Sequence, residues 1–329
     1  FLTDGSTLTI NKDSAELKKM QITGKIDVSG EGSSLLANMT GDSSISSREG
    51  SSSTVAIEAS KGGKVELNMS GANSSISGDV KTGTGQNASI TANLSGGSSR
   101  FAGNAEAVGD FSGNNTINLS LSGDNAQQLG NLKAEGNNTL NAVYSGRNSS
   151  LAGTADNKGI MNLAFTNQSV MNGDILNGVK VYEDNVSQSS FAGQLTANFE
   201  QSSWNGNLSN QGGTAGIILD RGSLWTGNLD NRGGTSGVTL SGGGTWKGDL
   251  SNQGGTADVT LHRGSVWTGK SSMSGADSVT NVSVNEGSTW KVTADSTVST
   301  LKLSGGTVDL GGIGIRMNIG HLSPGDGNP

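Results

Sequence analysis

Short runs in which apolar and polar residues alternate recur along the chain. Trp225, Gly227 and Leu229 occupy alternate positions of one run, and Ile217 and Leu219 do so in another. A repeat of two residues is typical of a β-strand, in which successive side chains point to opposite faces. Glycine pairs separate the runs, and glycine disfavours a helix by roughly 1 kcal/mol but suits a tight corner. The pattern therefore predicts strands that alternate with turns.

The strand pattern repeats with a period of 21 residues over the blocks 206–226, 227–247 and 248–268. A segment of about 20 residues cannot bury a core of its own. Each block is therefore predicted to be one coil of a solenoid, in which neighbouring coils stack. Every period carries a tryptophan that is followed two positions later by a glycine. These tryptophans are Trp204, Trp225, Trp246 and Trp267.

Towards the N-terminus the pattern of an apolar residue followed two positions later by a glycine continues less regularly. Asparagines at the edges of apolar runs give a second marker, whose spacing falls from 30 to 21 residues along the chain. The apolar residues that stand two positions before a glycine are Ile76, Phe101, Leu151, Met171 and Phe191. The marker asparagines are Asn38, Asn68, Asn93, Asn118, Asn141 and Asn162.

We expect an all-β protein, a right-handed parallel β-helix (solenoid) of about a dozen coils stacked at roughly 4.8 Å. Residues 1–310 are predicted to form one continuous domain, with irregular longer coils over 1–160 and regular 21-residue coils over 204–268. A long loop is predicted at residues 182–190, and residues 311–329 are predicted to form the C-terminal edge.

Composition agrees with a slender solenoid, because each coil buries few side chains. Only 31% of the residues are hydrophobic and 53 are glycine. The net charge is −7, and residues 1–203 hold 13 Lys and Arg against 19 Asp and Glu. This argues against nucleic acid, whose binding needs a dense basic footprint. The chain has no cysteine, which excludes a disulfide framework and a cysteine-ligated metal.

The frames SLWTGNL, GTWKGDL and SVWTGK with their GGT corners, and the segment STLKLSGGTVDL that ends at Leu310, resemble the passenger domain of a type V autotransporter. Such passengers are pertactin-like parallel β-helices of the pectin-lyase-like kind. The resemblance implies a precursor with a signal sequence and a C-terminal outer-membrane barrel that tethers the passenger. Neither segment is found here, so we expect a processed or excised piece that ends before the autochaperone cap.

The resemblance further implies display at the bacterial surface or secretion, and a non-enzymatic role in self-association, aggregation, biofilm formation or attachment to a host. The expected partners are the same passenger on neighbouring cells, or a host matrix protein or glycan. A candidate polar binding edge comprises Asn210, Asn231 and Asn252 beside Thr214, Thr235 and Thr256. The alternative for these asparagines is a structural ladder of stacked amides. The tryptophans are predicted to stack inward, although an outward column could bind sugars.

A second hypothesis is a module that binds glycosaminoglycan or extracellular matrix. Its candidate cations are Arg221, Lys247 and Arg263. Arg221 and Arg263 are two periods apart, and Lys247, Lys270 and Lys291 lie near them. Spaced cations could hold sulfated or carboxylated sugars, but ordinary solvated surface is the alternative. The segment YEDN at residues 182–185 is a further candidate, because loops that project from a rigid scaffold often carry binding.

Catalysis is the least favoured function. His262 and His321 are the only histidines, and neither has the neighbours of a catalytic triad. A polysaccharide lyase would need clustered acids for calcium and a basic residue for proton abstraction, and no such acidic set is found. The sequence therefore predicts no catalytic residues, no metal and no cofactor.

Overall fold

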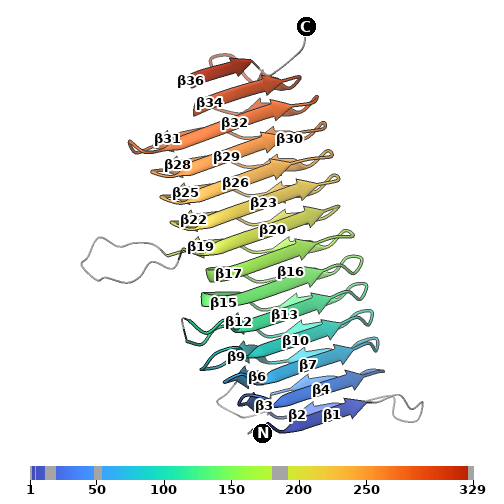
Figure 1. Ribbon diagram of the computed structural model, residues 1–329. Helices are drawn as coiled ribbons and strands as arrows, with labels where there is room; N and C mark the ends of the chain where they lie inside the picture. Colours follow the sequence, from blue (N-terminus) through green and yellow to red (C-terminus); the bar gives the residue numbers. More distant parts are fainter. Residues whose placement is uncertain are drawn as a thin grey trace. The chain divides into compact units, whose positions relative to one another are not determined.

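The computed structural model describes residues 2–3, 5–11, 20–47, 54–110, 112–179 and 192–324 (Figure 1). Every regular element in this part of the chain is a β-strand. It contains no helix long and apolar enough to cross a membrane. Phe191 and the loop at residues 182–190, for which the sequence makes predictions, lie outside the described residues.

The strands stack as a parallel β-solenoid with about 13 turns in total, which confirms the predicted fold class. The chain divides into two compact units, unit 1 over Phe1–Asn172 and unit 2 over Gly173–Pro329. In each unit the strands belong to two sheets. The strands of one sheet are three or four residues long and are called narrow strands below, and the remaining strands belong to the other sheet. The single domain predicted over residues 1–310 stays a prediction.

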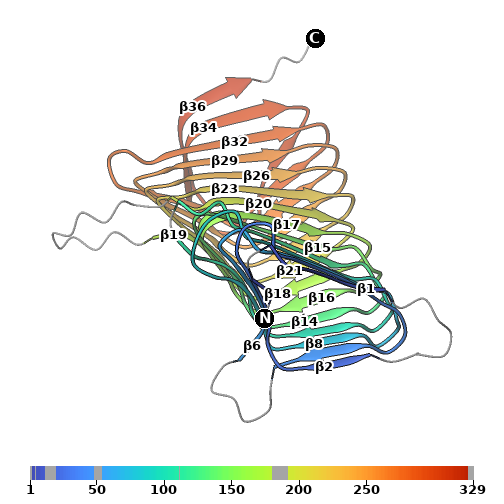
Figure 2. The ribbon, with the colours of Figure 1, turned by 60° about the horizontal axis from the view of Figure 1, so that its bottom comes forward.

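Unit 1 contains seven narrow strands, several of which are visible as one layer in Figure 2. The narrow strands are β2 (Gln21–Thr23), β5 (Ser44–Ser46), β8 (Ser75–Ser77), β11 (Arg100–Ala102), β14 (Gln127–Leu129), β16 (Ser150–Ala152) and β18 (Val170–Asn172). The other strands are β1 (Thr7–Asn11), β3 (Ile26–Ser29), β4 (Ser34–Met39), β6 (Val55–Ser60), β7 (Lys64–Met69), β9 (Asp79–Thr82), β10 (Ser89–Leu94), β12 (Ala105–Ala107), β13 (Thr116–Leu121), β15 (Leu132–Tyr144) and β17 (Ala155–Phe165).

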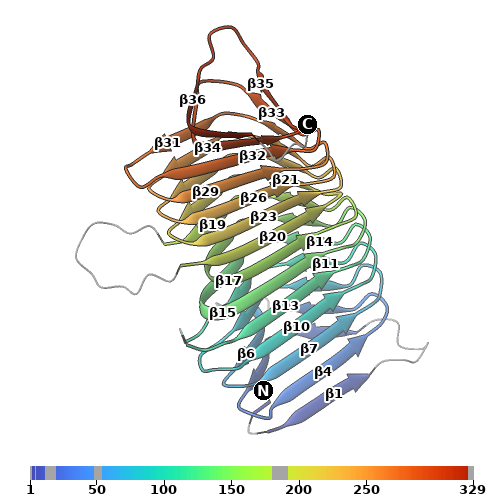
Figure 3. The ribbon, with the colours of Figure 1, turned by 45° about the horizontal axis from the view of Figure 1, so that its top comes forward.

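Unit 2 repeats the same plan, and Figure 3 shows β20, β23, β26 and β29 side by side. The narrow strands are β21 (Ser203–Asn205), β24 (Leu224–Thr226), β27 (Thr245–Lys247), β30 (Val266–Thr268), β33 (Thr289–Val292) and β35 (Thr307–Leu310). The other strands are β19 (Ile175–Gly178), β20 (Gln194–Glu200), β22 (Leu208–Gln211), β23 (Thr214–Asp220), β25 (Leu229–Arg232), β26 (Thr235–Leu240), β28 (Leu250–Gln253), β29 (Thr256–Leu261), β31 (Ser271–Ser274), β32 (Val279–Asn285), β34 (Ser296–Ser304) and β36 (Met317–Pro324).

The strand register in unit 2 follows the 21-residue period. Each strand pairs in parallel with the equivalent strand one coil further on, so that Trp204 is aligned with Trp225, Trp225 with Trp246, and Trp246 with Trp267. The next coil is 23 residues long and aligns Trp267 with Trp290. The column therefore contains one tryptophan more than the regular period predicts.

The interior of unit 2 is built on this tryptophan column. All five rings are fully buried, with neighbouring ring centroids 4.5 to 4.8 Å apart and planes within 5° of parallel. The spacing matches the distance between stacked strands, so the rings pack face over face along the stack. The predicted inward stack is confirmed, and an outward column of rings for sugar binding is excluded.

The interior of unit 1 contains the residues that the irregular frame predicts. Ile76, Phe101, Leu151 and Met171 are all fully buried. They lie in narrow strands whose other two residues point outward, which is the alternation expected for strands with one face in the core.

Candidate binding surfaces

The three asparagines of the predicted polar edge, Asn210, Asn231 and Asn252, are fully buried. Nδ2 of Asn210 donates to Oδ1 of Asn231 at 2.8 Å, and Nδ2 of Asn231 donates to Oδ1 of Asn252 at 2.9 Å. Stacked amides hydrogen-bond in this way along the axis of stacked strands. Of the two interpretations that the sequence leaves open, the structural asparagine ladder is the one found.

The ladder satisfies the backbone at one corner of each coil. Nδ2 of Asn231 also donates to the main-chain oxygens of Gly234 and Thr256, each at 3.0 Å. Oδ1 of Asn231 accepts a further bond of 3.0 Å from the hydroxyl of Ser236. Carbonyl groups at a buried corner need such donors, because water does not reach them. The prediction that these asparagines form an edge for partners is therefore wrong, since their side chains do not reach the surface.

The threonines of the same predicted edge lie outside the core. Thr214, Thr235 and Thr256 begin β23, β26 and β29 and are aligned in register. Thr214 and Thr235 are exposed and Thr256 is half-buried. A partner can reach this threonine column, and its role in binding stays a prediction.

The three candidate cations do not form one row. Arg221 and Arg263 lie in turns that precede narrow strands, whereas Lys247 is the last residue of β27. Arg221 forms an ion pair of 2.5 Å with Glu200, and Arg263 forms one of 3.8 Å with Glu286. Both arginines therefore have a carboxylate beside them, and their charge is partly compensated.

A column of alternating charge crosses the outer face of unit 1. Strand pairing aligns Glu58 of β6 with Lys81 of β9, Lys81 with Glu106 of β12, and Glu106 with Lys133 of β15. The sign of the charge thus reverses at every coil over four consecutive coils. We refer to Glu58, Lys81, Glu106 and Lys133 as the charge column.

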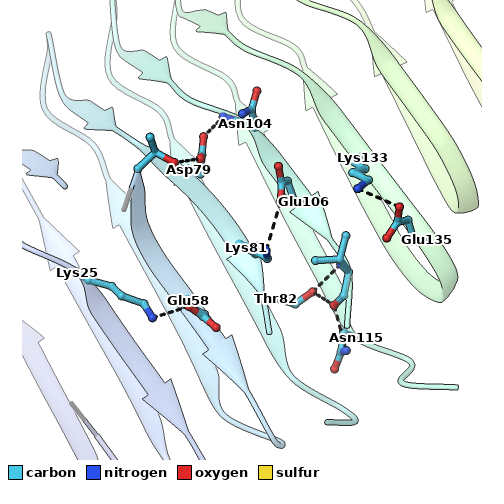
Figure 4. A network of polar contacts seen from close by, with 12 residues as sticks. Lys25, Glu58, Asp79, Lys81, Thr82, Asn104, Glu106, Asn115, Lys133 and Glu135 are labelled. Carbon is cyan, nitrogen blue, oxygen red and sulfur yellow. Dashed lines mark hydrogen bonds and ion pairs between the residues drawn. The ribbon is translucent and has the colours of Figure 1, made fainter. Parts of the chain in front are cut away.

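Ion pairs along and beside the charge column are visible in Figure 4. Lys25 bridges to Glu58 at 2.5 Å, Lys81 to Glu106 at 3.7 Å, and Lys133 to Glu135 within its own strand at 2.9 Å. The side chains of the column remain 24% to 38% exposed, so a second molecule can still reach them. Ion pairs with this exposure stabilise a fold by only about 0 to 1 kcal/mol each.

Lys25 and Lys133 keep their charge at neutral pH. Burial would lower the pKa of Lys25, but hydrogen bonds and charges from Glu58 and Asp27 outweigh it and raise that pKa above its ordinary value. The hydrogen bond that Lys133 donates to Glu135 raises the pKa of Lys133. Sequence reasoning missed the charge column because its members are 23, 25 and 27 residues apart.

Two ladders of partly exposed asparagines also line unit 1. Asn68 donates to Asn38 at 2.9 Å and Asn93 donates to Asn68 at 2.8 Å. The other three marker asparagines form a second ladder that is displaced by two residues along the strand, because Asn93 aligns with Ser120 and Asn118 aligns with Thr91. In that ladder Asn141 donates to Asn118 and Asn162 donates to Asn141, each at 2.8 Å.

The described residues contain no constellation that points to catalysis. No group of three or more His, Cys, Asp and Glu among them could hold a metal ion. A groove in unit 1 follows the corners of three coils and includes Glu31, Lys61 and Lys64, without a histidine or a second carboxylate. His262 and His321 lie far apart in the register of unit 2, just after β29 and within β36.

Comparison with known proteins finds no family model, no curated protein and no solved structure that matches this chain. Inference about its function therefore depends on the fold and on the polar surfaces described above.

Proposed function

We propose that this chain is a bacterial surface adhesin of the autotransporter-passenger type, which associates side by side with further copies of itself. The parallel β-solenoid and the resemblance of its WTG frames to such passengers support this class of protein. The observation that carries the self-association is the charge column, because a surface whose charge alternates in sign is complementary to itself.

The complementarity follows from a twofold arrangement. A twofold axis that lies in the contact plane, parallel to the strands and level with the midpoint between Lys81 and Glu106, would place Glu58 of one copy opposite Lys133 of the other. The same axis would place Lys81 opposite Glu106, so that four ion pairs form in one isologous contact. Each exposed pair contributes at most about 1 kcal/mol, so two isolated copies bind weakly. Many copies tethered on two facing cells multiply these contacts.

Charge reversal provides the test. In one variant Lys81→Glu and Lys133→Glu make the column entirely negative, and in a second Glu58→Lys and Glu106→Lys make it entirely positive. Cells that display either variant alone should lose aggregation, because like charges then face each other. A mixture of the two populations should aggregate again, because the two columns are now opposite in sign.

A control reverses the same number of charges elsewhere in unit 1. Lys61→Glu and Lys64→Glu alter exposed residues outside the column and should leave aggregation unchanged. Thermal unfolding of all three purified variants checks that the solenoid is intact. Undiminished aggregation by both column variants, or failure of the folded mixture to aggregate, would contradict the proposal.

A further inference from the structure

Three lysines of unit 2 lie on or beside the outer face of the narrow strands. Strand pairing aligns Thr226, Lys247, Thr268 and Lys291 in one column across β24, β27, β30 and β33. Lys270 stands in the turn that follows β30. We refer to this column, together with Lys270, as the lysine face.

The lysines of the lysine face form no ion pair within the part of unit 2 that the structure describes. Arg221, Arg232 and Arg263 of this unit each form an ion pair, whereas Lys247, Lys270 and Lys291 form none with any described residue. The outward positions of β24, β27, β30 and β33 contain no acidic residue. The face is thus a local positive surface on a chain whose net charge is −7.

Two acids lie beside the lysine face. Asp309 of β35 is aligned with Lys291 in the next coil, but the two side chains form no ion pair. Asp249 occupies the turn position equivalent to Lys270 one coil earlier, and its Oδ1 accepts a bond of 3.0 Å from the main-chain N–H of Lys270. This carboxylate is therefore directed to the backbone of the turn. The ammonium groups of the lysine face remain available to an anion in solution.

The tryptophan column holds the lysine face in a fixed geometry. Trp246, Trp267 and Trp290 lie directly beneath it in the same strands, fully buried and stacked. Lys247 and Lys291 are two coils apart, which places their backbones about 9.6 Å apart at the usual strand spacing. A rigid surface loses little freedom on binding, which favours affinity.

We propose that the lysine face binds a linear anionic polysaccharide that lies along the stacking direction. Acidic groups on alternate sugars of an extended chain have a spacing comparable to that of Lys247 and Lys291. Each lysine would hold one carboxylate or sulfate group as a point charge. The hydroxyl of Thr268, midway between them, would hydrogen-bond to the intervening sugar.

A nucleic acid fits this surface less well. Its phosphates recur at every nucleotide and require a dense basic footprint, whereas the lysine face consists of three lysines, two in the column and Lys270 beside it. The lysine face contains three members of the cation stripe predicted from the sequence, Lys247, Lys270 and Lys291, but neither Arg221 nor Arg263. The proposal does not depend on self-association, which uses unit 1.

The test measures binding of the purified chain to immobilised hyaluronan, which carries a carboxylate on alternate sugars, and to heparin. Uncharged dextran and a DNA duplex are the comparison ligands. The double variant Lys247→Gln and Lys291→Gln should weaken binding to the two anionic polysaccharides about tenfold, as expected for two lost surface ion pairs. Affinity should also fall as salt increases.

The matched control is Arg221→Gln with Arg263→Gln, which removes two positive charges from the same unit and should leave affinity within about twofold. Because the tryptophan column lies beneath the face, an unchanged tryptophan emission spectrum shows that each variant is folded. Equal losses in the two double variants, or no binding of either anionic polysaccharide, would overturn the proposal. DNA bound as tightly as hyaluronan through the same lysines would also overturn it.

Discussion

The indole N–H of Trp246 donates a hydrogen bond of 2.8 Å to the main-chain oxygen of Gly227 in the preceding coil. The same bond joins Trp225 to Gly206 at 2.8 Å and Trp267 to Gly248 at 2.9 Å. Each tryptophan thus stacks on its neighbours through its ring and is bonded to the previous coil through its nitrogen. The bond satisfies the polar atom of a ring that is otherwise buried among apolar groups.

Truncation of Trp246 should test this arrangement. Trp246→Ala removes ring contacts on both sides and opens a cavity, at a cost of about 3 to 5 kcal/mol in the free energy of unfolding. Trp246→Phe keeps part of the stack but leaves the oxygen of Gly227 without its donor, so a smaller loss is expected. Denaturant unfolding measures both. Native emission at the wavelength of solvent-exposed tryptophan would be incompatible with the buried column.

Glycine two positions after Trp204, Trp225, Trp246 and Trp267 has a steric cause. A Cβ placed on Gly248 would lie 1.9 Å from the main-chain oxygen of Gly227, and such an approach forces the coils apart. We expect Gly248→Ala to destabilise the protein by at least about 2 kcal/mol. Gly237→Ala is the control, because the nearest atom to its Cβ would be 4.0 Å away. Similar unfolding midpoints for the two variants would refute the steric explanation.

The regular part of unit 2 could be predicted from the sequence because its coils have equal length. Because the coils are equally long, Trp225 and Trp246 occupy the same position of the 21-residue sequence period. The tryptophan column can therefore be predicted from the sequence alone. In unit 1 the coils differ in length, so the spacing of two residues in the sequence no longer shows whether they are aligned in neighbouring strands. Asn118 follows Asn93 at the marker spacing, yet Asn93 aligns with Ser120. The charge column escaped prediction for the same reason.

The asparagine ladder shows a second limit. A polar residue beside a glycine corner is compatible with either a surface position or a buried one, and composition does not decide between them. Burial of Asn231 depends on the carbonyl of Gly234 and on the neighbouring amides of Asn210 and Asn252, which only the folded stack brings together. The lack of ion pairs at Lys247, Lys270 and Lys291 could not be predicted from the sequence either, because ion pairing depends on side-chain geometry.

Asn231→Ala should therefore destabilise the protein and not merely remove a surface contact. The substitution removes one acceptor of the Asn210 amide and the donor to Oδ1 of Asn252. It also removes one donor each from the main-chain oxygens of Gly234 and Thr256. Each buried group left unpaired costs about 1 to 3 kcal/mol. We expect a total loss above about 3 kcal/mol. Thr235→Ala, at an exposed neighbouring position, should change stability by less than about 0.5 kcal/mol. Urea unfolding of both variants makes the comparison, and a tolerated Asn231→Ala would contradict the ladder.

Tyr144 should make the stability of the protein depend on alkaline pH. Its ring is fully buried and stacked on Phe165 with centroids 4.5 Å apart, and its hydroxyl donates a hydrogen bond to Oε1 of Gln128. Burial raises the pKa of Tyr144 well above its ordinary value of 10.0, because the phenolate would lose its hydration. The hydroxyl therefore keeps its proton in the folded state at pH values where the unfolded chain releases it.

The sign of the effect follows from proton linkage. Below about pH 10 the hydroxyl is protonated in both states, and the contribution of Tyr144 to stability is constant. Above that pH the unfolded state loses a proton that the folded state retains, so stability should fall by about 1.4 kcal/mol per pH unit. Tyr144→Phe should be less stable at pH 8 by about 1 to 2 kcal/mol, because Gln128 loses its partner, but it should lack this slope. Urea unfolding of both proteins between pH 8 and pH 11 isolates the difference, because the two proteins share every other titratable group. Parallel curves for the two proteins would show that Tyr144 does not retain its proton through burial.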